Sequence, residues 1–343
     1  MESLILKTSG EKPDFDLIEA EIPDPVPGFV IVKVSAVGLC HHDISVIDGT
    51  LSRGVKRDVI LGHEISGEVY AIGNGVQDVN IGDKIVTTLT SSCGACEVCI
   101  SGNDYQCPNS YGFGHGIDGG LSEYIPVSLH NLVKLPDNFD LIKSSLLACP
   151  IGVVIHALRD VAKLSRGINL VVYGVGGGLG VHALQVASYY KAETIGFTHS
   201  ENKVADLTDL GLGHVLLMDQ DLDSSELVMA FTEDVGANIV FNPVGSSVFE
   251  AGIRSLSDHG TMLVLGEIAG NTSSINLAEI MFRNASVTGS TGASIPHIEG
   301  AVELMEKGFI DPIVGAQFAL DEIMQAYDMM KSSSVLGRVV IKI

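Results

Sequence analysis

Residues Leu170–Gly180, with the sequence LVVYGVGGGLG, place a short apolar run directly before a cluster of glycines. An apolar pattern with helical spacing begins at Val181, so the glycines lie where a buried strand turns into a helix. Glycine permits a tight turn and lets the backbone approach a pyrophosphate, whose charge lies at the positive end of the helix. We therefore predict a nucleotide-binding turn, with a plain flexible turn as the alternative. The residues predicted to contact the nucleotide are Gly174, Gly177, Gly178, Leu179 and Gly180.

Around this turn, from about Pro150 onward, strand patterns alternate with helix patterns. Strands are expected at 168–173, 194–198, 239–242 and 262–265, and helices at 181–190 and 202–210. Such alternation is typical of a doubly wound parallel sheet, and it ends near residues 287–289.

The first half of the chain consists instead of short strand patterns separated by glycine and proline, with few helical patterns between them. These strands are expected at 30–34, 65–71, 84–88 and 124–127. A chain of 343 residues is long enough for two domains. We predict an α/β protein in which residues 1–149 and 289–343 form a β-rich domain and residues 150–288 form the parallel-sheet domain.

The charge of the chain restricts its partners. Lysine and arginine total 20 against 42 aspartates and glutamates, a formal net charge of -22, so the surface field should repel nucleic acid. The N-terminal residues lack the basic and apolar regions of a secretory signal, and no membrane-length apolar window is expected. We predict a cytoplasmic protein that acts on a small molecule and does not bind a membrane. In that reducing compartment the six cysteines should stay free, which favours metal binding.

Four of the six cysteines lie within one short loop, at positions 93, 96, 99 and 107. This spacing allows four thiolates to surround one tetrahedral zinc ion, and such a closed set of ligands leaves no position for substrate. The sequence therefore predicts a structural zinc lobe at about residues 91–109, held by Cys93, Cys96, Cys99 and Cys107. Disulfides or inert buried thiols are the alternatives.

The other two cysteines, Cys40 and Cys149, lie far apart, and His63 and Glu64 lie between them in sequence. Two thiolates and one imidazole would give three ligands and leave a fourth position open, as in a catalytic zinc site. Taken singly, each of these residues also has a structural interpretation, because a lone cysteine often packs as a small apolar residue.

Residues 62–73, GHEISGEVYAIG, resemble the zinc-containing alcohol dehydrogenase signature of the medium-chain dehydrogenase/reductase superfamily. The loop at 93–107 is similar to the structural-zinc lobe of that family, and Gly38-Leu39-Cys40 is similar to its first catalytic ligand. The resemblance covers essentially the full length of the chain. The glycine cluster is one residue longer than Gly-x-Gly-x-x-Gly, and it resembles a variant found in the same family.

The resemblance implies two zinc ions per chain. The catalytic ion would be held by Cys40, His63 and Cys149, with Glu64 able to approach it during ligand exchange. Asp43 matches the family's supporting acid, which would accept the far ring N–H of His63. A loop cap is the alternative role for Asp43.

The resemblance also implies the fold and the assembly. We expect a GroES-like catalytic domain, a Rossmann domain inserted at 150–288, and a homodimer or homotetramer built through the nucleotide domains.

The end of the second Rossmann strand indicates which nucleotide binds. An acidic residue for the ribose of NAD is expected there, but Thr198 occupies the position. Thr198, His199, Ser200 and Lys203 could surround the 2′-phosphate of NADP, which favours NADP(H) over NAD(H). The alternative is an ordinary loop whose lysine points into water. Arg338 resembles a family position that reaches the cofactor phosphates, with an exposed surface arginine as the alternative.

The implied function is hydride transfer between a nicotinamide and a zinc-bound alcohol, aldehyde or ketone. The family's usual proton relay begins with a serine or threonine, but this chain has His42 there, and Ser45 where a relay histidine is usual. His42 is itself a candidate acid or base, or a residue that faces a cofactor phosphate. The departure resembles a branch of archaeal reductases that act on acryloyl-CoA, which is the second hypothesis. A third, from another class, is a non-catalytic nucleotide-binding protein.

Overall fold

The computed structural model describes residues 1–218, 223–270 and 272–343, and their contacts divide the chain into two compact units. The first unit comprises Met1–Gly152, Gly292–Glu306 and Val314–Ile343, and the second comprises Val153–Thr291 and Lys307–Ile313. The junctions therefore lie at 152/153 and 291/292, where the sequence predicted 149/150 and 288/289. Residues 307–313 belong to the second unit because the side chain of Gln185 exchanges two hydrogen bonds with the backbone of Asp311, at 2.9 and 2.8 Å.

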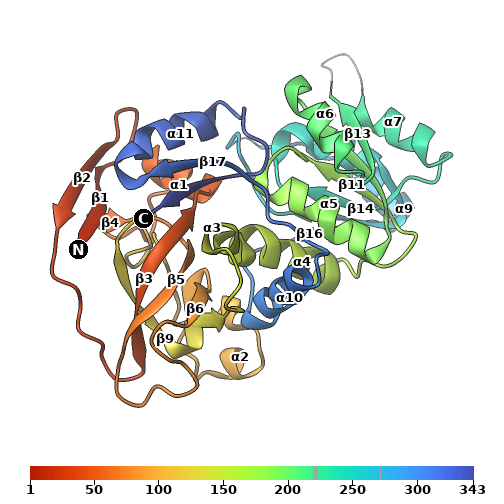
Figure 1. Ribbon diagram of the computed structural model, residues 1–343. Helices are drawn as coiled ribbons and strands as arrows, with labels where there is room; N and C mark the ends of the chain where they lie inside the picture. The colour runs from red at the N-terminus through yellow and green to blue at the C-terminus, as the bar shows by residue number, and fades with distance from the viewer. Residues whose placement is uncertain (219–222, 271) are drawn as a thin grey trace. The chain divides into compact units, whose positions relative to one another are not determined.

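The first unit is built on a seven-stranded sheet in the order β10-β6-β5-β3-β18-β17, with β9 also paired to β3 (Figure 1). Its strands are β3 (Phe29–Gly38), β5 (Glu64–Ile72), β6 (Lys84–Thr87), β9 (Tyr124–Ser128), β10 (Leu132–Lys134), β17 (Val314–Ala319) and β18 (Arg338–Lys342). Most residues of β3, including Val30, Ile31 and Val32 in succession, and the first four residues of β5 are buried, so both faces of these strands are covered. The antiparallel pairing of β18 with β3 returns the C-terminal segment to this unit.

Smaller elements complete the first unit. They are β1 (Glu2–Thr8), β2 (Asp14–Glu19), β4 (Val59–Ile60), β7 (Thr90–Ser91), β8 (Tyr111–Gly112), α1 (His41–Ile47), α2 (Glu97–Ile100), α3 (Leu141–Ser144), α10 (Ile295–Glu306) and α11 (Ile323–Lys331).

The second unit is a six-stranded parallel sheet in the order β13-β12-β11-β14-β15-β16. Its strands are β11 (Asn169–Tyr173), β12 (Glu193–Thr198), β13 (His214–Leu217), β14 (Ala237–Asn242), β15 (Leu256–Val264) and β16 (Ser286–Gly289). Its helices are α4 (Val153–Ile155), α5 (Gly178–Tyr190), α6 (Glu201–Asp209), α7 (Ser224–Phe231), α8 (Phe249–Arg254) and α9 (Leu277–Arg283). Residues 170–173 of β11 are fully buried, as helices on both faces of a parallel sheet require. The strand order reverses between β11 and β14, the point at which such sheets bind ligands.

A continuous helical stretch at Leu141–Val161 is long and apolar enough, by length and composition alone, to cross a membrane. The expectation that no such window exists was wrong, because the charges at Lys143, Arg159 and Asp160 lie only near its two ends. Within the protein, 83% of this window is buried, so burial in the protein accounts for its hydropathy. Such a buried helix is weak evidence for a membrane span.

Candidate metal centres and nucleotide site

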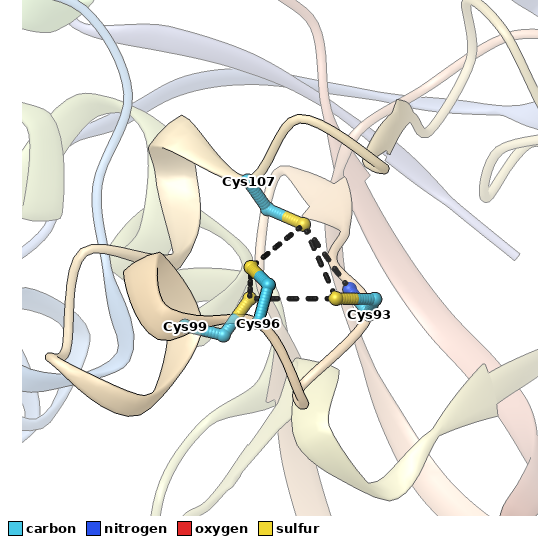
Figure 2. Close-up of side chains that lie close together, drawn as sticks. All are labelled: Cys93, Cys96, Cys99 and Cys107. Carbon is cyan, nitrogen blue, oxygen red and sulfur yellow. Dashed lines mark hydrogen bonds between the residues drawn. The ribbon is translucent and has the colours of Figure 1, made fainter.

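The four cysteines of the lobe lie together around a common centre in the first unit (Figure 2). Their sulfur–sulfur distances are 3.5 Å for Cys93–Cys107 and Cys96–Cys99, 3.8 Å for Cys96–Cys107 and 4.0 Å for Cys93–Cys99. Zinc–sulfur bonds of about 2.3 Å in a tetrahedron would separate the sulfurs by about 3.8 Å, whereas a disulfide would need about 2.05 Å. All six cysteines are in fact free thiols. The donor set therefore fits a tetrahedral ion, and the disulfide alternative is wrong.

The protonation of this cluster also favours a bound cation. Backbone N–H groups of Ala95 and Cys96 lower the pKa of Cys93 to about 6, while burial and the adjacent thiols raise the pKa of Cys99 to about 12. Four sulfurs at these distances resist ionising together because their charges repel. A divalent ion removes that conflict, since it binds thiolates.

The second cluster is assembled from three distant segments of the first unit. Cys40 precedes α1, His63 and Glu64 lie at the start of β5, and Cys149 lies in a π-helix at Ala148–Gly152. One potential ligand atom from each residue lies within 4.8 Å of all the others. The Sγ atoms of Cys40 and Cys149 are 3.9 Å apart, again close to the edge of a zinc–thiolate tetrahedron. Two sulfurs and an imidazole nitrogen of these residues fit one ion.

Asp43 faces the histidine of this cluster. Its Oδ1 lies 3.7 Å from Nδ1 of His63, and its Oδ2 accepts the backbone N–H of Cys40 at 2.8 Å. Burial opposes a charged imidazole, but the carboxylate of Asp43 and the adjacent Cys40 raise the pKa of His63 well above its ordinary value. The geometry therefore combines both roles considered for Asp43, since it caps the start of α1 and lies on the far side of the His63 ring.

Arg338 lies at this cluster with only 5% of its surface exposed. Its Nε and Nη2 donate to the two carboxylate oxygens of Glu64 at 3.1 and 2.6 Å, and Nη2 lies 3.6 Å from Sγ of Cys149. Burial raises the pKa of Glu64 although Arg338 opposes that shift. The exposed-surface alternative for Arg338 is wrong, and its Nε and Nη2 donors are directed at Glu64 and Cys149. The sequence could not indicate the ion pair between Arg338 and Glu64, because the register of β18 against β3 brings the two residues together.

A row of imidazoles extends from the cluster. The ring of His42 lies 5.2 Å from that of His63 and 5.1 Å from that of His115. Burial lowers the pKa of His42, as does the nearby His63. The Nδ1 atoms of His42 and His115 are buried without a hydrogen-bond partner among the described residues. Ser45 donates its hydroxyl to the carbonyl of His41 at 3.0 Å, so it does not extend this row. His115 was not predicted from the sequence, where its position in a glycine-rich loop was the one indication of a role.

In the second unit, the glycine cluster forms the turn between β11 and α5, as the sequence predicted. Gly174 has a φ of 65°, and a Cβ on Gly180 would overlap the carbonyl oxygen of Gly174. Gly177, Gly178 and Leu179 belong to the same turn, at the N-terminal end of the 13-residue α5. Val244, which follows β14 and was not predicted from the sequence, packs its side chain against Gly174.

Lys203 lies over this turn rather than in solvent, which contradicts the water-facing alternative. It is 5% exposed, its Nζ donates to the carbonyl of Gly176 at 3.4 Å, and burial lowers its pKa. A Cβ on Gly176 would lie 2.6 Å from Cδ of Lys203 and 3.5 Å from Oγ1 of Thr198. His199 is exposed and Ser200 is partly exposed beside them. The backbone N–H of Ser200 donates to Oγ1 of Thr198 at 3.1 Å.

These two units are those of a zinc-binding dehydrogenase. Residues 26–137 match the alcohol dehydrogenase GroES-like domain, and residues 178–307 match the zinc-binding dehydrogenase domain. Over 342 residues the chain is 30% identical to an acryloyl-coenzyme A reductase of Metallosphaera sedula, covering 99% of each chain. It is 29% identical to an alcohol dehydrogenase of Geobacillus stearothermophilus, covering 97% of this chain and 96% of the relative.

Solved structures agree with this assignment. The alcohol dehydrogenase of Aeropyrum pernix superposes with a TM-score of 0.91 at 26% identity, covering 100% of both chains. The chain belongs to the zinc-binding alcohol dehydrogenase family of the medium-chain dehydrogenase/reductase superfamily. The predicted family and the predicted fold class, a GroES-like domain with a Rossmann domain, are confirmed. The chain is an oxidoreductase of this family, a result that opposes the hypothesis of a non-catalytic nucleotide-binding protein.

Proposed function

We propose that this protein is a zinc-dependent, nicotinamide-linked alcohol dehydrogenase or carbonyl reductase whose catalytic ion is held by Cys40, His63 and Cys149. The convergence of these ligand atoms within 4.8 Å, from three segments far apart in sequence, is the observation that carries the proposal. A zinc ion at this centre would supply Lewis acidity toward an alcohol or carbonyl oxygen, and a bound nicotinamide would supply the hydride acceptor or donor.

The residues around the Cys40 centre would orient its ligands and supply a group for proton transfer. Oδ1 of Asp43 lies 3.7 Å from Nδ1 of His63, and its charge would keep the ring proton on Nδ1 and leave Nε2 with a free electron pair for the ion. Arg338 holds the carboxylate of Glu64 beside the ligands, and Glu64 remains close enough to enter the ligand set. His42, next to His63, is the group proposed to donate or accept the substrate proton. The four cysteines of the lobe would hold a second zinc ion with a purely structural role.

The test is turnover of a panel of alcohols and carbonyl compounds by zinc-loaded protein with each nicotinamide cofactor. We expect oxidation of an alcohol, loss of turnover when a chelator removes the ion from the Cys40 centre, and recovery on adding zinc. His42→Asn should lower turnover. Ser45→Ala is the matched control, because its hydroxyl is bonded to the carbonyl of His41. Turnover that survives removal of the catalytic ion would contradict the proposal.

A second candidate function is reduction of the double bond of a small enoyl-CoA thioester. It is favoured by the match over 99% of the chain to a relative named acryloyl-coenzyme A reductase. NADPH consumption with acryloyl-CoA, together with inactivity on every alcohol of the panel, would establish this function in place of the first.

We further propose that NADP(H) is preferred over NAD(H). The buried ammonium group of Lys203, beside the hydroxyl of Thr198, supports recognition of a 2′-phosphate. A charge-assisted hydrogen bond of about 1.5–3 kcal/mol predicts that Lys203→Met weakens NADPH binding by about 10- to 100-fold. NADH binding should change little, and Lys191→Met, at an exposed position of the same unit, is the control. Equal losses for both nucleotides would contradict this role.

We propose a cytoplasmic homodimer or homotetramer that associates through the second unit. The support is that β16 is an edge strand and that α9, directly before it, exposes Leu277, Met281 and Phe282 by 72, 62 and 77%. A second copy would cover this apolar surface and the open strand edge. Phe282→Asp should lower the sedimentation coefficient. Ile81→Asp, at an exposed position of the first unit, should not.

A further inference from the structure

Asp104 is a buried acid that none of the roles above uses. It lies in a short 3-10 helix at Asp104–Gln106, inside the four-cysteine loop, and is 6% exposed. Its Oδ1 accepts the backbone N–H of Ile295, the first residue of α10, at 3.3 Å. Burial raises the pKa of Asp104. Burying a carboxyl group costs free energy unless hydrogen bonds replace those lost to water, so the bond to Ile295 N–H helps to hold Asp104 in place.

Two further contacts join the same loop to the start of α10. A Cβ on Gly292, where φ is 70°, would lie 3.0 Å from Cβ of Tyr105. A Cβ on Gly102 would lie 3.9 Å from Cγ of Pro296. The four-cysteine loop therefore fixes both the approach to α10 and its first turn.

The same end of α10 packs against the π-helix that carries Cys149. A Cβ on Gly152 would lie 3.2 Å from Cβ of Ala293 and 3.4 Å from Cγ1 of Ile298, so there is no room between the two segments. The π-helix has a widened turn, and Pro150 within it has no backbone N–H to donate. The position of Cys149 therefore depends on what packs against this segment.

We infer that Asp104 is a positioning residue for Cys149: it anchors α10 to the four-cysteine loop, and α10 holds the π-helix at the distance that the Cys40 centre requires. All of these residues belong to the first unit. The inference rests on the proposed function and deepens that proposal, because it gives the four-cysteine lobe a second role. Besides stabilising its own loop, the lobe sets how firmly the other centre keeps its ion.

The test uses full-length protein with zinc in the four-cysteine centre and cobalt in the Cys40 centre. The cobalt–thiolate absorption reports the geometry of the Cys40 centre and, in excess chelator, the rate at which the ion leaves. Direct supporting partners of metal ligands change affinity by about 10- to 100-fold, so a partner acting through one helix should change the release rate by about three- to tenfold. Asp104→Ala should therefore release cobalt faster and shift its absorption bands.

Asp104→Asn is the matched control, because its carboxamide oxygen can still accept from Ile295, and it should behave as the unaltered protein does. Ala293→Gly, which removes the Cβ atom that lies against Gly152 and should fold, is the second variant. It should accelerate cobalt release while the four-cysteine centre keeps its zinc. Unchanged release from Asp104→Ala or from Ala293→Gly, or equal acceleration by Asp104→Asn, would overturn the inference. Failure of the unaltered protein to bind cobalt would instead overturn the proposed function.

Discussion

The two proposed metal centres of this protein are built in opposite ways. The lobe takes all four ligands from one loop of 15 residues, Cys93–Cys107, and offers four sulfurs to one ion. The Cys40 centre takes its ligands from three segments, mixes sulfur with nitrogen and carboxylate oxygen, and has Asp43 and Arg338 packed around it. A closed set of identical ligands suits stability, whereas a mixed set with supporting residues suits exchange of one ligand for substrate. The contrast predicts that the two centres respond differently to the same kinds of substitution.

The largest difference should come from removing one ligand of the Cys40 centre. Cys40→Ala should lower kcat/KM by at least about 1,000-fold, because the reaction loses the ion that polarises the substrate oxygen. The melting temperature should change by only a few degrees, on the order of 1 kcal/mol or less. Activity and thermal melting measured on the same preparation check this. A variant that keeps substantial activity would show that the Cys40 centre is not catalytic.

The reciprocal substitution is Cys96→Ser in the lobe. It should cost on the order of 3 kcal/mol of stability, because binding of a structural zinc ion contributes directly to folding. The fraction that remains folded should retain a ligand set at the Cys40 centre and therefore measurable turnover. Denaturant unfolding and metal content per chain are the measurements. Full stability with one zinc ion per chain would contradict the division of the two centres into structural and catalytic.

A smaller effect should follow from Asp43→Asn. The amide can present its NH₂ group to Nδ1 of His63 and favour the wrong tautomer, which should weaken metal binding at the Cys40 centre by about 10- to 100-fold. The four-cysteine centre should keep its affinity, since Asp43 contacts none of its ligands. Competition with a chromogenic chelator, which resolves two classes of site, measures both affinities. Equal weakening of the two classes would mean that Asp43 supports the fold rather than the ligand.

The smallest effect concerns pH and the metal-free lobe. Because the pKa of Cys93 is lowered to about 6, its exposed thiolate should form as the pH rises through about 6 and be lost below it. Alkylation of Cys93 by iodoacetamide should therefore increase by about tenfold between pH 5 and 7 and then level off. Cys99, with a pKa of about 12, should react far more slowly at neutral pH. Mass spectrometry of the labelled peptides measures both, and zinc-loaded protein, in which neither thiol should react, is the control.

Much of each site was predictable where the ligands are close in sequence. The spacing of the four cysteines limits how far the sulfurs can separate. The glycines at 174–180 directly follow an apolar strand pattern, which is where a turn is expected. Cys40, His63 and Cys149 are too far apart for spacing to indicate their meeting. The family resemblance supplied their association, and the structure brings them together.

Other features of the protein were not predicted, because they depend on tertiary packing. The sequence did not indicate Arg338 as the partner of Glu64, but the pairing of β18 with β3 puts it beside Glu64 and Cys149 and not on the surface. The sequence offered little indication of a role for His115 and none for Asp104, because each becomes significant only through a neighbour far away along the chain. The apolar window at 141–161 was also missed, since its charges lie at its ends.

The sequence by itself indicated the local features of this protein: the four-cysteine ligand set, the glycine turn between strand and helix, and the acidic net charge. Short-range spacing and residue type are enough for these, because the covalent chain restricts local geometry. Only the tertiary structure decided which charges neutralise one another at the Cys40 centre and which elements hold Cys149. Those choices follow from strand register and helix packing, in which a shift of one residue would direct every side chain to a different neighbour.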